Sequence, residues 1–162
     1  MSSGRFAIAT HALALLAESD EGYASDHVAK SVNTHPVFLR RVMSMLCKAG
    51  IARAREGRGG GYRLARPAAK IRLADVYAAT EPEGAIAPSP CEPNARCRIG
   101  AGIRAAFEEA AAEANAGLLR GLSRRTIADV ATRAIEIAGT APGAVTTGKK
   151  PKESVPWHPV RT

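Results

Sequence analysis

Apolar residues recur three and four positions apart over the first fifty residues, a spacing that predicts three amphipathic helices. The first helix covers 4–18, and its apolar face is formed by Phe6, Ala9, Leu13 and Leu16. A shorter helix follows the break at Glu21-Gly22 and begins at Ser25, a residue type that caps helix N-termini. Its inward residues are Val28, Ala29 and Val32.

The third helix begins near Pro36, because the missing N–H of proline costs nothing in a first helical turn, and it ends at Gly50. Its inner stripe is formed by Leu39, Val42, Leu46 and Ala49. The outer face then carries Phe38, Arg40, Arg41, Ser44, Met45 and Lys48. Two helices joined by the turn 33–35 predict a helix-turn-helix.

Two short strands, 51–55 and 62–66, are joined by a loop with four glycines in its six residues. A phosphate-binding P-loop requires Lys-Ser/Thr after its last glycine, where this chain has Tyr62-Arg63. A dinucleotide-binding loop opens a helix, whereas this segment leads to Pro67. The pattern therefore favours a β-wing beside the helix-turn-helix.

The second half of the chain predicts a short helix over 73–79, an irregular segment over 81–99 and a long helix over 100–122. The long helix carries a stripe of small and apolar residues: Phe107, Ala110, Ala111, Ala114, Leu118 and Leu122. A helix that extends beyond a compact domain has little of its own chain to pack on, so we expect a homodimer. A further helix begins at Ser123 or Thr126 and reaches Ile137.

The predicted fold class is mainly α with a small β-wing, a winged helix-turn-helix plus a long dimerisation helix. The predicted parts are a DNA-binding domain over 1–80, a cysteine-containing sensor loop over 81–99 and the dimerisation and C-terminal helices over 100–138. The tail 139–162, rich in Pro, Gly, Thr and Lys, is predicted to be disordered.

The charge is concentrated on the predicted recognition helix and wing. The net charge is +8, while positions 40–72 hold ten Lys and Arg residues against the single acid Glu56. A basic block on a helix and a hairpin suits contact with phosphates, so double-stranded DNA is the expected partner. A solvated basic surface and a winged module that binds an acidic protein are the alternatives.

The candidate DNA-binding residues lie on the second and third helices and on the wing: Ser25, His35, Phe38, Arg40, Arg41, Ser44, Arg55, Arg58, Gly59, Gly60, Tyr62 and Arg63. Arg40 or Arg41 is expected to pair with guanine, and the wing arginines to contact phosphate or the minor groove. His35 contacts phosphate or caps the helix, and Tyr62 contacts the DNA backbone or packs within the wing.

Other classes of function find less support. No apolar run approaches the length of a membrane span, and no signal-peptide pattern begins the chain, so a cytoplasmic location and no membrane partner are expected. No nucleophile–base set or paired catalytic carboxylates stand out, so an enzyme is not expected.

The segments 31–42, 46–51 and 57–67 together resemble the Rrf2 family of bacterial transcriptional regulators, which includes an iron–sulfur cluster regulator and a nitric-oxide-sensing repressor. Residues 71–77 resemble the helix that follows in that family. The resemblance covers about the first 137 residues. It implies a homodimer that crosses at the long helix and a pair of winged domains on a near-palindromic DNA site.

Many members of that family bind an iron–sulfur cluster through three cysteines in the loop before the dimer helix. Cys91 and Cys97 correspond to the first two, but 98–104 contains no third cysteine. Two thiolates leave a cluster two ligands short. His11, Glu92 or the partner chain are alternatives that the sequence does not choose between, and neither a metal site nor a cofactor is assigned.

A redox switch is the hypothesis that needs no further ligands. Cys97 lies between Arg96 and Arg98 and precedes the long helix. The two guanidinium groups and the N-terminus of that helix all favour the thiolate form of Cys97. Cys91 is then the thiol that resolves an oxidised Cys97 as a disulfide. Two unmodified thiols in a loop are the alternative, and Cys47 is expected to be a semi-buried packing residue.

Overall fold

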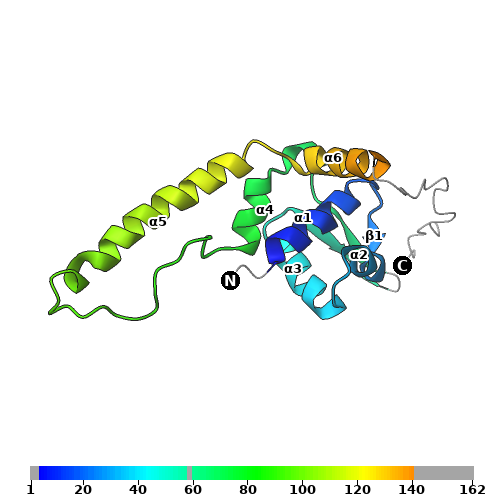
Figure 1. The fold of residues 1–162 in the computed structure, drawn as a ribbon. Coiled ribbons are helices and arrows are strands. Elements are labelled where there is room, and N and C mark those ends of the chain that lie inside the picture. Colours follow the sequence, from blue (N-terminus) through cyan, green and yellow to red (C-terminus); the bar gives the residue numbers. More distant parts are fainter. Residues whose placement is uncertain (1–3, 58–59, 141–162) are drawn as a thin grey trace.

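The computed structural model describes residues 4–57 and 60–140. Within them it has six α-helices, one 3-10 turn and a three-stranded sheet, which confirms the predicted mainly α class with a small β-wing. In chain order these are α1 (Arg5–Leu16), β1 (Tyr23–Ala24), α2 (Ser25–Val32), α3 (Pro36–Lys48), β2 (Ala52–Arg55), β3 (Gly61–Leu64), η1 (Ala68–Lys70), α4 (Leu73–Thr80), α5 (Gly100–Leu122) and α6 (Ile127–Thr140). The head, formed by every element except α5, lies at one end of the molecule, and α5 extends away from it (Figure 1).

The core of the head is formed around α1, which packs against α2, α3, α4 and α6. Its largest fully buried side chains include Leu13, Leu16, Leu39, Met43, Leu46, Ile51, Ile71, Val76 and Ile127. The predicted stripe of α3 is corrected at two positions, since Met43 is fully buried and Ala49 is exposed. Met43 belongs to the hydrophobic core of the head, and Ala49 is the residue that caps the C-terminal end of α3.

The turn between α2 and α3 is fixed by local chemistry. Asn33 ends α2 in the left-handed conformation, with a φ of 54°. His35 then caps α3, because its Nδ1 accepts a hydrogen bond from the Val37 N–H at 3.2 Å, and Pro36 occupies the first helical turn as predicted. The capping alternative for His35 is therefore confirmed.

The sheet has the strand order β1-β3-β2, with both pairs antiparallel. The strand β1 was not among the predicted elements; it is only two residues long and pairs Tyr23 with Tyr62 and Ala24 with Gly61. The strands close tightly at Gly61, where a Cβ would lie 2.0 Å from the Tyr23 carbonyl oxygen. Ala24 precedes α2 as its cap residue and Ser25 makes no side-chain cap, so the capping role expected of Ser25 is wrong.

The segment that follows α5 is joined to the residues just before α4 and at its start by backbone hydrogen bonds. The Leu73 N–H donates to the Arg125 carbonyl, and the Ile127 N–H donates to the Ile71 carbonyl, each at 2.9 Å. Thr126 then opens α6, since its hydroxyl accepts from the Asp129 N–H at 3.2 Å and its own N–H donates to the Asp129 carboxylate at 2.7 Å. This reciprocal cap confirms the second of the two predicted starts.

The long helix has the predicted bounds, and α6 is longer than predicted. It continues through Gly139 to Thr140, two residues that the sequence analysis placed in the tail, and the rest of that tail lies outside the described residues. Across the described ranges, none of the helices combines the length and the apolar character of a membrane span.

Candidate nucleic-acid interface

The outer face of α3 carries an exposed group of basic side chains. Arg40, Arg41, Ser44 and Lys48 are exposed, while Phe38 is half-buried against the core. These residues, with Arg5 of α1, border an open depression of about 640 Å³. None of Arg40, Arg41 and Lys48 has an ion-pair partner among the described residues. The face therefore presents positive charge that the described part of the chain does not neutralise.

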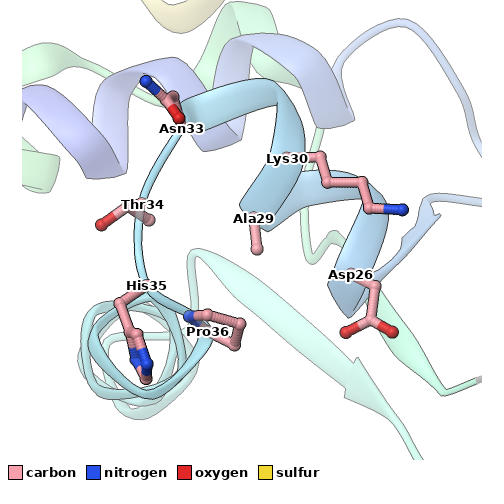
Figure 2. Close-up of a pocket in the computed structure, with 7 residues that line it drawn as sticks. All are labelled: Asp26, Ala29, Lys30, Asn33, Thr34, His35 and Pro36. Atoms are coloured by element: carbon pink, nitrogen blue, oxygen red, sulfur yellow. The ribbon is translucent and has the colours of Figure 1, made fainter.

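A second depression, of about 460 Å³, lies at the turn between α2 and α3. Figure 2 shows Ala29 of α2 and Pro36 of α3 at its centre, with Asp26 and Lys30 projecting from α2 and with His35 at the beginning of α3. Because Nδ1 of His35 is used in the helix cap, only its Nε2 remains for an outside partner.

The wing separates its side chains onto two faces. Pairing of β2 with β3 sets Arg53 opposite Arg63 and Arg55 opposite Gly61, so the three arginines share one face. Arg53, Arg55 and Arg63 are all exposed. Like charges directly opposite each other destabilise an antiparallel pair, and a polyanion relieves that cost.

Tyr62 lies on the other face of the wing, opposite Ala54, and packs half-buried against the core of the head. This placement fits the packing alternative for Tyr62, and its contact with the DNA backbone stays a prediction. Two other candidates contact each other, because the Ser25 N–H donates to the Gly60 carbonyl at 3.3 Å. Arg58 and Gly59 lie outside the described residues.

Not every basic residue of the 40–72 block is available to a partner. Arg66 pairs with Asp75 at 3.0 Å, and the same carboxylate accepts from the Arg72 N–H. Arg53, in contrast, was missing from the sequence-based candidates. Strand alternation from Arg55 gives the signal that would have identified it, because residues two apart share a face.

The loop 81–99 contains two exposed cysteines, Cys91 and Cys97. Backbone N–H groups of Gly100 and Ile99, at the start of α5, hydrogen-bond the Cys97 sulfur and hold the pKa of this thiol below its ordinary value of 9.0. The direction of the pKa shift agrees with the sequence-based expectation. Of the two causes expected there, the start of the long helix accounts for the shift, and the flanking guanidinium groups do not. Burial raises the pKa of Cys47, which is half-buried on α3.

The donor set around these cysteines does not fit an iron–sulfur cluster within one chain. Among the described residues, no three His, Cys, Asp or Glu side chains come together as metal ligands. His11 lies on α1, where its ring nitrogen is 3.4 Å from the Ser31 hydroxyl, and Glu92 forms an ion pair with Arg104. Both side chains proposed to complete the ligand set therefore have other partners.

Comparisons with known proteins agree on one family. Residues 2–133 match the Rrf2 family, described as iron-dependent transcriptional regulators. YwnA of Bacillus subtilis, designated an HTH-type transcriptional regulator, is 34% identical over 130 residues, which cover 80% of this chain and 96% of YwnA. A crystal structure of a transcriptional regulator from Lactobacillus plantarum superposes with a TM-score of 0.66 at 25% identity, over 82% of this chain and 90% of that one. IscR of T. potens shares the fold, with a TM-score of 0.61 at 21% identity over 88% of this chain and 93% of that one.

Proposed function

The chain belongs to the Rrf2 family of transcriptional regulators, and on that premise we propose that it is a homodimeric repressor that binds a specific DNA sequence in the cytoplasm and responds to thiol oxidation. The observation that carries the DNA-binding part is the exposed basic surface of α3 and the wing. It is formed by Arg40, Arg41, Lys48, Arg53, Arg55 and Arg63.

In this proposal α3 enters the major groove. Arg40 and Arg41, in its first half, reach base edges, where a bidentate pair with guanine discriminates by about 1–3 kcal/mol. The wing contributes phosphate contacts through Arg53, Arg55 and Arg63, which add affinity without reading sequence. The cap at His35 fixes where α3 begins and thereby which of its side chains reach the bases.

The dimer is supported by the exposed apolar side chains of α5. Ile103 and Phe107 are 47% and 42% exposed and lie one helical turn apart, and Leu118 and Leu119 are also exposed. Ala111 is the buried residue of α5 among those described. Covering this apolar surface with the α5 helix of a second copy gives the two heads a fixed separation on DNA.

Regulation is assigned to Cys97. A peroxide oxidises the Cys97 thiolate to a sulfenic acid and is itself reduced to water or an alcohol. The Cys91 thiol then attacks that sulfur, a disulfide forms and water leaves. Since Cys97 hydrogen-bonds the start of α5, a disulfide in this loop changes the end of the dimerisation helix and lowers DNA affinity.

The test is a binding assay with the full chain under reductant and under peroxide. Duplexes selected from a random library by the reduced protein should bind orders of magnitude more tightly than random duplex, and peroxide should weaken that binding. Equal affinity for selected and random duplexes contradicts sequence-specific regulation and favours a protein-interaction module. A peroxide effect that persists in Cys97→Ser contradicts the assignment of the switch to Cys97.

A further inference from the structure

Asn115, in the second half of α5, holds the first residues of the loop 81–99 against the long helix. Its side-chain oxygen accepts hydrogen bonds from the backbone N–H groups of Ala85 and Ile86, at 3.1 and 3.2 Å. Its side-chain nitrogen donates to the Ile86 carbonyl at 2.9 Å. One amide thus satisfies three backbone groups that lie about thirty residues away along the chain.

The fit of the loop around this amide is close. Gly84 has a φ of 78°, and a Cβ at this position would lie 3.1 Å from the side-chain nitrogen of Asn115. Aspartate would keep the two accepted bonds but would set a carboxylate oxygen against the Ile86 carbonyl. Only a side-chain amide of this length offers both the acceptor and the donor that the loop requires.

The contact between Asn115 and residues 85–86 completes a triangle within the fold. The other two sides of this triangle are α4 and the last part of α5. The two helices pack against each other, and Arg72, just before α4, forms a backbone bridge with Thr126, four residues after the end of α5. From there α4 runs about 12 Å to Thr80, and α5 runs about 10 Å from Leu122 back to Asn115. The contact between Asn115 and 85–86 joins their far ends, so it fixes the angle at which α5 leaves the head.

We propose that Asn115 is a positioning residue that sets the distance between the two DNA-reading heads, an inference that rests on the proposed dimer. The N-terminal end of α5 lies about 33 Å from Leu122, so a rotation of about 10° at the bridge moves that end by about 6 Å. The rise of one base pair is about 3.4 Å, so such a rotation changes the matching half-site separation by one to two base pairs.

The experiment compares wild type with Asn115→Leu, which removes all three hydrogen bonds, and Asn115→Asp, which removes the donor. Glu113→Gln is the matched control, because Glu113 is exposed on the same helix and is not one of the residues that form the triangle. Wild-type protein first selects duplexes from a random library. Each protein is then titrated with the selected duplex, with a single half-site, and with duplexes whose half-sites are moved by one or two base pairs.

We expect both Asn115 variants to bind the single half-site as wild type does. The ratio of their affinity for the selected duplex to their affinity for duplexes with moved half-sites should fall about tenfold, which corresponds to about 1.4 kcal/mol. Hydrogen exchange should show lost protection at the Ala85 and Ile86 amides. An unchanged spacing preference in a variant whose two amides exchange faster overturns the inference. A wild-type protein that selects no duplex contradicts the proposed function itself, and the two failures are therefore distinct.

Discussion

Arg53 and Arg63 lie directly opposite each other in the antiparallel pair of β2 and β3, and both are exposed. Two guanidinium groups on neighbouring strands repel each other in the free protein. The wing keeps this pair although a neutral residue at either position would stabilise the sheet. We interpret the pair as a phosphate-binding feature whose cost is offset only when DNA is bound.

The first prediction concerns this pair. Arg63→Thr should stabilise the free protein by about 0.2–1 kcal/mol, because the repulsion across the strands is removed. It should also weaken DNA binding and reduce the slope of log affinity against log salt by about 1.8 for the dimer, because each of the two subunits loses one phosphate contact worth about 0.9. Urea unfolding and salt titrations measure the two effects. Arg124→Thr is the matched control, since it removes an exposed arginine between α5 and α6 and should change neither quantity.

The second prediction separates the recognition helix from the wing. Arg40→Ala or Arg41→Ala should cost about 1–3 kcal/mol per half-site of the selected duplex and much less on random DNA, because a base contact is lost in each half-site. Competition binding to duplexes with single base-pair changes should show relaxed preference at one position per half-site. If both variants and Arg63→Thr lose the same affinity on selected and random DNA, this division between base and phosphate contacts is wrong.

The sequence predicted elements that depend on local chemistry and missed features that depend on distant partners. Helical periodicity gave α5 its bounds, and Pro36 after His35 indicated the start of α3. The strand β1 has two residues and exists only because β3 pairs with it, so no local pattern reveals it. Met43 is buried in the core that the neighbouring elements of the head complete, and the same periodicity permitted the neighbouring stripe that includes Ala49.

The residues of the candidate site also divide into those that a local pattern predicts and those that depend on distant partners. The arginines of α3 were identified from the amphipathic pattern, whereas the pairing of Arg53 with Arg63 needed the strand register. Asn115 gave no signal at all, since a single amide on a helix indicates no partner thirty residues away.

The third prediction follows from the cysteine environments. The pKa of Cys97 is held below 9.0 by backbone N–H groups, so its thiolate forms at lower pH than that of an ordinary thiol. Its alkylation rate by iodoacetamide should rise with pH and reach half its maximum below pH 9.0. Cys47, whose pKa is raised by burial, should react slowly and at higher pH. Peptide mass spectrometry across a pH series measures both rates, and a faster reaction at Cys47 than at Cys97 would contradict the environments described.

The fourth prediction concerns the ion pair that joins the N-terminal end of α1 to the end of α4. Nη2 of Arg5 lies 2.8 Å from the Glu81 carboxylate, whose side chain is only 11% exposed. Glu81→Gln should destabilise the head by about 1–3 kcal/mol, because the half-buried guanidinium of Arg5 loses its charged hydrogen-bond partner. Urea unfolding measures the loss. Glu83→Gln is the control, since Glu83 is exposed and lies two residues further along the same loop.

The last prediction tests the dimer without DNA. Phe107→Glu places a charge in the exposed apolar stripe of α5, where burial against a second copy would leave it without a partner, and burying an unpaired charge is costly. Sedimentation should therefore show a molecule of half the wild-type mass, while circular dichroism keeps its helical signal because Phe107 contributes little to the core of the head. Glu109→Ala, two positions along and on the other side of the helix, should sediment as wild type does. A dimeric Phe107→Glu variant would mean that another surface holds the two copies together, and the angle set by Asn115 would then not determine the distance between the heads.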